Sequence, residues 1–386
     1  MSQEITQESI PYGTLGIISL ESCKKLGEKV DAYIALWRND KDLPAVHYEG
    51  YKRNSYRIDA ICPRFGSGEG KGVINESVRG LDLYILVDVC NHSLTYSLNG
   101  YTNHMSPDDH YQDLKRVIAA VGGKARRITV IMPFLYESRQ HKRSARESLD
   151  CALALQELTN MGVESIITFD AHDPRVQNAI PLKSFETVQP TYQFIKAMLK
   201  NVADIKMNAQ NMMIISPDEG AMGRAVYFAN VIGADVGMFY KRRDYTTIVN
   251  GKNPIVAHEF LGADIEGKDV VIIDDMISSG ESMIDVATEL KRRKANRIFV
   301  AATFGLFTEG FDKFDKAYEN GLIYRVLTTN LVYQPEELLT KEYYINVDMS
   351  KYIALLIDTL NHDASISKLL SPTERIQNIL ERYHQK

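Results

Sequence analysis

The sequence predicts an α/β protein that contains two mainly parallel sheets covered by helices, and three observations lead to this prediction. Short apolar runs alternate with amphipathic helical patterns along almost the whole chain. Several of these runs are apolar at every position, as expected for strands that are buried on both faces of a parallel sheet. The runs are numerous enough for two sheets, and a chain of 386 residues is long enough to form two cores.

The predicted elements follow this alternation in order along the chain. The expected strands span residues 81–89, 128–134, 165–169, 212–216, 236–240, 270–273 and 298–303. Helical patterns are expected at residues 109–121, 144–161, 191–199, 223–232 and 282–294. Ser144 and Glu147 have the spacing of a capping box, so the second of these helices is predicted to begin near Ser144.

The domain boundary is predicted from the number of elements, because no linker rich in Pro, Gly or Ser is present. We expect it near residues 181–190. The chain then divides into an N-terminal extension (1–45), an N-terminal domain (46–185), a C-terminal domain (186–350) and a C-terminal helical segment (351–386). Helical patterns at residues 20–37 and 371–386 support the first and last of these segments.

The composition indicates a globular protein, with 45% hydrophobic and 25% charged residues. The formal net charge of −5 gives no overall attraction to nucleic acid or to an anionic membrane. The four cysteines are scattered without a CxxC pair, which argues against a zinc site or a disulfide framework. No apolar run approaches the length of a membrane span, and the first residues lack the features of a signal peptide. We therefore expect a cytoplasmic protein.

The segment VVIIDDMISSGES, residues 270–282, is the most informative part of the chain. Its first four residues predict a buried strand, and Asp274 and Asp275 are expected where that strand ends. The loop that follows contains Ser278, Ser279, Gly280, Glu281 and Ser282. Backbone N–H groups that converge on such a loop bind anions, and paired carboxylates suit ribose hydroxyls or a metal ion. The alternative is an ordinary strand-to-helix turn that is capped by Ser279.

Basic side chains follow two other predicted strands. The strand at 128–134 is followed by Arg139, Gln140, His141, Lys142, Arg143 and Arg146. Cations at the carboxyl edge of a parallel sheet face the usual ligand crevice, where guanidinium groups could clamp a polyphosphate. Lys241, Arg242 and Arg243 open a long polar stretch that could form a mobile lid. The alternative in both cases is a solvated basic loop.

Acidic residues and a histidine follow two further strands. Asp170, His172 and Asp173 come after one of them, and Asp218 comes after the next, with Arg224 on the following helix. Such groups can bind a divalent ion beside a nucleotide, although magnesium usually prefers oxygen ligands. Taken singly, a structural histidine and an acidic turn at a helix start explain these residues better than a metal site does.

The glycine-rich segment GSGEGKG, residues 66–72, is interpreted as a hairpin rather than a P-loop. Its spacing is one residue short of the P-loop pattern, and Gly72 stands where a Ser or Thr would contact magnesium. No convincing helix follows it.

The order of these clusters resembles that of the ribose-phosphate pyrophosphokinase (phosphoribosyl pyrophosphate synthetase) family, from about residue 64 to about residue 350. The resemblance is carried by RFGSGEGKGVINESVRGLDLYIL (64–86), ITVIMPFLYESRQHKRSAR (128–146), IITFDAHD (166–173), IISPDEG (214–220), KRR (241–243) and VVIIDDMISSGES (270–282). ATFGLFTEG (302–310) and TTN (328–330) are similar to later landmarks of the family. The ribose-phosphate loop is shared with type I phosphoribosyltransferases.

The resemblance implies two tandem domains of phosphoribosyltransferase type, each a mainly parallel sheet flanked by helices, in a homo-oligomer. The implied reaction transfers the β,γ-diphosphoryl group of ATP to the 1-hydroxyl of ribose 5-phosphate, with Mg²⁺ as the cofactor, and feeds nucleotide biosynthesis. Phe65 would stack on adenine, while Ser67 and Glu69 would bond the base from a neighbouring subunit. Arg139 and Gln140 would hold the nucleotide.

The same resemblance implies the remaining site residues. His172 and Asp218 would contact Mg²⁺, and Lys241 and Arg243 would stabilise the charge that develops on the transferred group. The ribose 5-phosphate site would consist of Asp274, Asp275, Ser278, Ser279, Gly280, Glu281 and Ser282. This distribution fits phosphoryl-type transfer, which depends on positioning and charge neutralisation more than on covalent chemistry.

Several departures mark the chain as a divergent member. His141 stands where the family has an acid, and Phe304 replaces a family histidine. In the ribose-phosphate loop, Ser278 replaces an Asp, and Glu281 places a negative charge near a phosphate site unless its side chain points away. The N-terminal extension and an insert around residues 101–109 are additional. Two alternatives follow: a catalytically weak or inactive regulatory subunit of the same fold, and a phosphoribosyltransferase.

Overall fold

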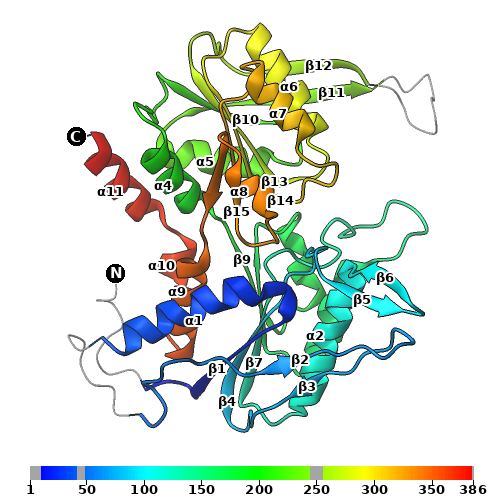
Figure 1. Ribbon diagram of the computed structural model, residues 1–386. Helices are drawn as coiled ribbons and strands as arrows, with labels where there is room; N and C mark the ends of the chain where they lie inside the picture. Colours follow the sequence, from blue (N-terminus) through cyan, green and yellow to red (C-terminus); the bar gives the residue numbers. More distant parts are fainter. Residues whose placement is uncertain (1–9, 41–47, 244–254, 385–386) are drawn as a thin grey trace. The chain divides into compact units, whose positions relative to one another are not determined.

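The computed structural model describes residues 10–40, 48–243 and 255–384, without the side chains of 241–258 and 384. The chain forms two compact units (Figure 1). Unit 1 comprises Met1–Gln189, Asn330–Tyr333 and Asp348–Ser371, and unit 2 comprises Pro190–Thr329, Gln334–Val347 and Pro372–Lys386. In the described part of the chain, no helix is both long and apolar enough to cross a lipid bilayer.

Unit 1 contains a parallel sheet of five strands among its described residues. In spatial order these are β1 (Thr14–Ser19), β4 (Leu81–Leu86), β7 (Arg127–Ile131), β8 (Ser165–Phe169) and β9 (Ser184–Val188). Its helices include α1 (Lys24–Arg38), α2 (Pro107–Val121), α3 (Asp150–Asn160), α9 (Ser350–Asn361) and α10 (Ser367–Leu370). β4 is buried at every position, as expected for a central strand of a parallel sheet.

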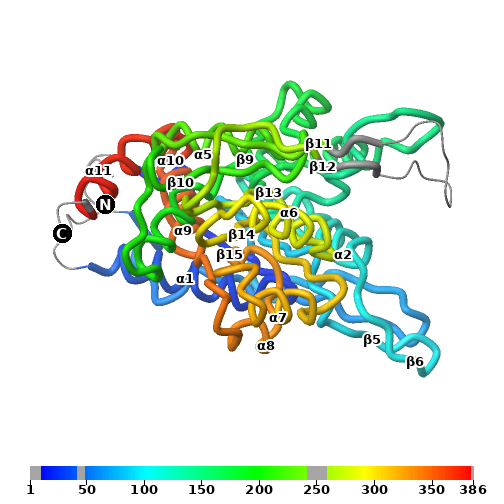
Figure 2. Tube along the Cα trace, turned by 90° about the horizontal axis from the view of Figure 1, so that it is seen from above, coloured from blue at the N-terminus to red at the C-terminus, as the bar shows by residue number. Residues whose placement is uncertain are grey.

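Unit 2 contains a sheet of seven strands among its described residues, in which the edge strand β12 runs antiparallel to β11 and the other pairs are parallel. Its order is β12 (Ile255–Leu261), β11 (Asp235–Arg243), β10 (Met212–Ser216), β13 (Asp269–Ile277), β14 (Ile298–Gly305), β15 (Arg325–Thr329) and β16 (Tyr344–Val347). The neighbouring strands β13, β14 and β15 can be followed in both views (Figures 1 and 2). Its helices include α4 (Thr191–Asn201), α5 (Met222–Ile232), α6 (Glu281–Arg292), α7 (Asp312–Glu319), α8 (Glu336–Thr340) and α11 (Thr373–His384). The predicted α/β class with two mainly parallel sheets is confirmed.

Two small antiparallel hairpins lie outside the sheet of unit 1. One pairs β2 (Ala60–Ile61) with β3 (Val73–Ile74), and the other pairs β5 (Thr95–Leu98) with β6 (Tyr101–His104). The first hairpin carries the glycine-rich segment, where Arg64 bridges to Gly70 and the Phe65 N–H donates to Glu69 O at 2.7 Å. The prediction of a hairpin in place of a P-loop is therefore confirmed.

The predicted start of the helix at 144–161 is wrong. α3 begins at Asp150, and Ser144 caps no helix, although its N–H donates to Glu147 Oε2 at 3.2 Å. Residues 144–148 are polar or small and exposed, and the buried stripe begins only at Cys151, so the preceding residues have no packing to stabilise a helix. A complete capping box occurs instead at Ser106, before α2.

The two terminal segments differ from the expected division, because they form parts of the units themselves. β1, within the expected extension, pairs with β4 along its whole length, from Thr14 beside Leu81 to Ser19 beside Leu86. At the other end of the chain, α9 belongs to unit 1 and α11 to unit 2, where α11 packs against α4 and α5.

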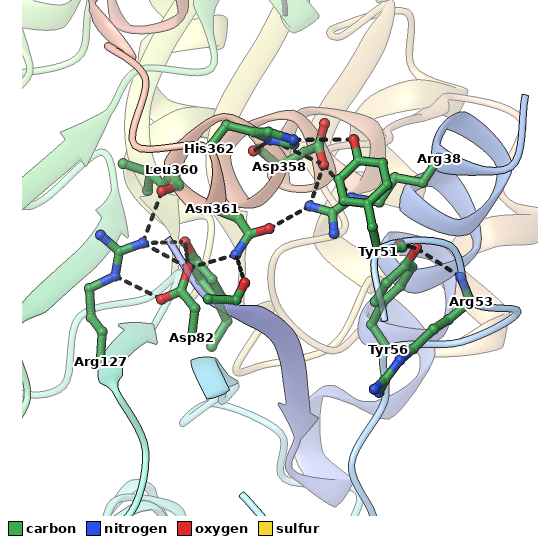
Figure 3. A network of polar contacts seen from close by, with 12 residues as sticks. Arg38, Tyr51, Arg53, Tyr56, Asp82, Arg127, Asp358, Leu360, Asn361 and His362 are labelled. Carbon is green, nitrogen blue, oxygen red and sulfur yellow. Dashed lines mark hydrogen bonds and ion pairs between the residues drawn. The ribbon is translucent and has the colours of Figure 1, made fainter. Parts of the chain in front are cut away.

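A buried polar network shows why α9 belongs to unit 1 (Figure 3). Arg38 of α1 donates to Asp358 Oδ1 at 2.8 Å and to Asn361 Oδ1 at 2.7 Å. Asn361 Nδ2 donates to Asp82 of β4 at 2.9 Å, and Asp82 accepts two further bonds from Arg127 of β7, both at 2.7 Å. The network therefore joins α1, α9 and two central strands through groups that satisfy one another away from water.

Candidate functional site

The two acids of the VVIIDD segment lie inside β13 rather than after it, because β14 continues beside the strand as far as Ile277. Asp275 is buried, and its Oδ2 lies 3.6 Å from Arg224 of α5. Burial, followed by the charge of Asp275, raises the pKa of Asp274 to about 8. The Asp274 carboxyl therefore retains its proton near neutral pH, and the pair can both donate to and accept from hydroxyl groups.

The loop after β13 leads directly into α6. Gly280 has a φ of +81°, and a Cβ at this position would lie 2.4 Å from Phe314 Cε2, so the site requires glycine. Gly280 is also the N-cap residue of α6, and no side chain caps the helix. The interpretation of a Ser279 cap is therefore wrong, since Ser279 Oγ accepts only a long 3.4 Å bond from the Glu281 N–H. The uncapped start of α6 is suited to an anion.

The segment after β14 supports this loop. The Thr308 N–H donates to Ser278 O at 3.0 Å, and the hydroxyls of these two residues lie 3.4 Å apart. The Leu306 N–H donates to Ile277 O at 2.9 Å. Ser282 is exposed in the first turn of α6. These contacts hold the loop in shape without a ligand.

The negative charge of Glu281 is paired. Lys313 of α7 lies 2.8 Å from Glu281 Oε1 and also forms an ion pair with Glu309 at 2.5 Å. The ammonium group of Lys313 lowers the pKa of the Glu281 carboxyl, which therefore stays ionised. The Glu281 carboxylate therefore points toward Lys313 of α7.

Asp218 lies in the turn between β10 and α5. Its Oδ1 accepts the N–H groups of Gly220 at 2.9 Å and Ala221 at 3.3 Å, so the carboxylate stabilises the turn before the helix, as the structural alternative expects. Its charge also contributes to the raised pKa of Asp274. Asp218 therefore belongs to one acidic cluster with Asp274 and Asp275.

This acidic cluster fits a magnesium ion that brings other ligands with it. Carboxylate oxygens are the groups that magnesium prefers, and a divalent cation would offset charges that already raise one pKa in the cluster. Across the described residues, no set of three or more His, Cys, Asp or Glu side chains is arranged to hold a metal ion. Magnesium commonly takes one or two carboxylates and completes its shell with water and substrate phosphates.

In unit 1, the loops after the neighbouring strands β7 and β8 contact each other. The rings of His141 and His172 lie 5.3 Å apart, and His141 Nε2 lies 3.5 Å from Asp173 Oδ2. A hydrogen bond from Arg175 is the main reason that the pKa of Asp173 falls to about 2. Asp173 thus places an ionised carboxylate beside His141, where the family pattern has an acid. The sequence reasoning did not connect these two residues.

The two residues expected to hold the nucleotide lie in the basic loop after β7. Arg139 is exposed, and Gln140 Nε2 donates to Ser148 O at 2.8 Å, which closes the loop on itself. Of the residues expected at the base, Phe65 is 54% exposed, and Ser67 Oγ donates to Glu69 Oε2 at 2.8 Å. These side chains therefore form part of the surface of unit 1.

Lys241 and Arg243 lie on β11, which pairs with β12 and has an irregularity in register between Arg242 and Arg243. Their side chains, and residues 244–254, lie outside the described part of the chain. The expectation of a catalytic lid falls on these residues and is untested by the structure.

The fold and the site define a protein with two units of phosphoribosyltransferase type, one of which carries an acidic pair followed by a loop that leads into the uncapped start of α6. A model of the N-terminal domain of ribose phosphate pyrophosphokinase matches residues 15–162, and a phosphoribosyl transferase domain model matches residues 182–328. The chain belongs to the ribose-phosphate pyrophosphokinase family.

Individual relatives agree with this assignment. The ribose-phosphate pyrophosphokinase of Vibrio cholerae is 28% identical over 319 residues, which cover 81% of this chain and 91% of the relative. That of Aquifex aeolicus is 26% identical over 317 residues, with the same coverage of 81% and 91%. The crystal structure of phosphoribosylpyrophosphate synthetase from Mycobacterium smegmatis has a TM-score of 0.70 at 20% identity, covering 91% of this chain and 100% of that one. At this identity, the structural likeness supports the fold alone.

Proposed function

We propose that the chain catalyses the Mg²⁺-dependent transfer of the diphosphoryl group of ATP to the 1-hydroxyl of ribose 5-phosphate. The hydroxyl oxygen attacks the β-phosphorus, and the bond from this phosphorus to the α,β-bridging oxygen breaks. The products are 5-phosphoribosyl 1-pyrophosphate and AMP, and the proton of the hydroxyl is released. The relatives from Vibrio cholerae and Aquifex aeolicus are named for this activity, ribose-phosphate pyrophosphokinase, and the product would feed nucleotide biosynthesis.

The observation that carries the proposal is the arrangement of the acid pair of β13 and the uncapped start of α6 in unit 2. Asp274, whose raised pKa of about 8 keeps its carboxyl protonated near neutral pH, and Asp275 present a carboxyl pair that suits the vicinal hydroxyls of ribose. The uncapped N-terminus of α6 lies a few residues further on and suits the 5-phosphate. The ion pair of Glu281 with Lys313 reduces the electrostatic objection to phosphate binding at this loop.

The remaining residues are assigned by the family pattern. Phe65, Ser67 and Glu69 would contact adenine, and Arg139 and Gln140 the phosphates. Asp218 of unit 2 and His172 of unit 1 would each contact magnesium, which would neutralise the polyphosphate when it is bound.

Lys241 and Arg243 would stabilise the charge on the transferred group. We also propose a homo-oligomer in which the adenine contacts come from a neighbouring subunit.

The two alternatives are less well supported. A phosphoribosyltransferase has no use for the N-terminal unit, yet residues 15–162 match the N-terminal domain of ribose phosphate pyrophosphokinase. The unusual phosphate loop suggests an inactive regulatory subunit, but in that loop Glu281 is paired with Lys313.

The proposal is tested by incubating the purified chain with ATP, ribose 5-phosphate and magnesium and separating the products by chromatography. We expect AMP and 5-phosphoribosyl 1-pyrophosphate in equal amounts, and no product when magnesium is chelated. Asp275→Asn, which keeps the size of a buried side chain beside Arg224, should lower the yield sharply in a folded protein. Absence of both products from a folded sample would favour the regulatory subunit.

A further inference from the structure

The β5–β6 hairpin, part of which is the insert around residues 101–109, lies beside the loop of the β2–β3 hairpin (Figures 1 and 2). That loop carries Phe65, Ser67 and Glu69, the residues assigned to adenine. The adjacent β5–β6 hairpin has no role in the function proposed above.

The β5–β6 hairpin has a shape that its own sequence specifies. Its strands are joined by Asn99 and Gly100, whose φ angles are +49° and +84°, as in the two-residue turn typical of an Asn-Gly pair. Along β5 the side chains alternate, with Tyr96 and Leu98 half-buried and Ser97 exposed. The hairpin therefore presents one defined face to the molecule and one to solvent.

The β5–β6 hairpin contacts the loop of the β2–β3 hairpin at three points. The Asn99 N–H donates to Gly66 O at 3.1 Å. Leu98 packs so closely on Gly68 that a Cβ at this glycine would lie 2.7 Å from Leu98 Cδ1. The guanidinium of Arg64 lies 5.5 Å from the centre of the Tyr96 ring.

α2 fixes the base of the same loop from a second direction. Arg64 donates to both carboxylate oxygens of Asp113, at 2.7 Å and 2.9 Å, and the two side chains are 9% and 8% exposed. Arg116 adds a bond to Asp113 at 2.8 Å. The base of the loop is thus held by a buried bidentate ion pair, whereas its tip, which has hydrogen bonds of its own, contacts the β5–β6 hairpin.

We propose that the β5–β6 hairpin is a positioning element. It holds the loop at Gly66 and Gly68, so that Phe65 is already placed to stack on the base of the diphosphoryl donor before the donor binds. The inference rests on the proposed function. Gly66, Gly68 and Gly70 leave the loop backbone conformationally free, so ordering it on nucleotide binding would carry an entropic penalty. A hairpin that orders the loop in advance reduces this penalty and increases donor affinity.

Leu98→Ala tests the inference, because it removes the contact with Gly68 and leaves the Asn-Gly turn intact. The probe is α,β-methylene ATP with magnesium, titrated by calorimetry, because it binds without transferring its diphosphoryl group. We expect Kd to rise about five- to tenfold, with an equal rise in KM for ATP. The KM for ribose 5-phosphate, kcat and the unfolding temperature should stay within experimental error. Leu98→Met should bind the probe as tightly as the wild type, because the methionine side chain is large enough to keep the contact with Gly68.

Two controls separate positioning from general damage. Ser97→Ala changes the solvent face of the same strand and should leave Kd unaltered. Hydrogen exchange of the amides at residues 65–69 should be faster in Leu98→Ala than in the wild type, with the amides of α2 unchanged. Tyr96→Ala, which removes the ring beside Arg64, should repeat the loss of affinity by an independent route.

The outcomes distinguish a positioning role of the hairpin from a general structural role, and both from a failure of the proposed function. Equal Kd values for the wild type and Leu98→Ala overturn the positioning role and leave the proposed function intact. A loss that extends to ribose 5-phosphate and to thermal stability also overturns it, because the hairpin would then support unit 1 as a whole. A wild-type protein that binds no adenine nucleotide overturns the proposed function itself, and the inference with it.

Discussion

Removal of the Asp358 carboxylate should strongly destabilise unit 1. Arg38 and Asp358 are each only 2% exposed, and their nearest N and O atoms are 2.7 Å apart (Figure 3). Asp358→Ala would leave the guanidinium in a buried site, where Asn361 would still accept one bond but supply no charge. Breaking such a pair on one side typically costs about 3–5 kcal/mol, because an uncompensated charge remains buried.

The assay is equilibrium unfolding in urea, followed by the fluorescence of Trp37. This residue is the single tryptophan of the chain and lies next to Arg38 in α1, so its signal reports on unit 1. Lys29→Ala is the matched control, because its ion pair with Asp348 also joins α1 to the segment before α9, at 3.1 Å, but with side chains 53% and 44% exposed. We expect the control to lower the free energy of unfolding by at most about 1 kcal/mol. A loss below about 1 kcal/mol for Asp358→Ala as well would refute the reasoning.

Three further predictions concern charge and pH. Lys241→Ala should lower kcat by about 10²–10³-fold with an unchanged unfolding temperature, and Lys241→Arg should retain part of the activity. An unaltered kcat in Lys241→Ala would contradict the catalytic role of this residue. Lys313→Met should raise the KM for ribose 5-phosphate, because Glu281 loses its partner. The rise in KM should be smaller at about 1 M than at about 0.1 M salt, because the Debye length falls from about 10 to about 3 Å. Lys316→Met on the same helix is the control, and equal effects of the two substitutions would contradict the pairing. Burial raises the pKa of Asp88 from 3.8 to about 7, so the folded state binds this proton more tightly than the unfolded chain. The stability difference between the wild type and Asp88→Asn should therefore fall as the pH rises from about 4 to about 7 and then level off, as measured by urea unfolding; a flat difference would contradict the assignment.

Local patterns in the sequence predicted the elements that carry the site. Continuous apolar runs placed the strands at Ser165–Phe169 and Met212–Ser216 with the bounds observed. The same signal located β13 but ended it too early, because Asp274 and Asp275 are polar and only the neighbouring β14 keeps them in the strand. Gly280 was recognised as part of the loop, whereas its close approach to Phe314 became visible only in the fold.

Features that depend on distant partners were not predictable from local patterns. Local patterns assign β1 to an appended segment, because its pairing partner β4 begins only at Leu81. The pairing of Glu281 with Lys313 joins the starts of two helices, and the contact of His141 with Asp173 joins two loops. Neither follows from periodicity or spacing, since tertiary packing decides both.

The path of the phosphates in the reaction tests the central claim most directly. ATP labelled separately in its α- and γ-phosphates is incubated with the chain, ribose 5-phosphate and magnesium, and the products are separated. Attack at the β-phosphorus predicts that the γ label appears in 5-phosphoribosyl 1-pyrophosphate, that the α label appears in AMP, and that the two products form in equal amounts. Labelled ADP with ribose bisphosphate, or recovery of both labels in unreacted ATP from a folded sample, would contradict the account.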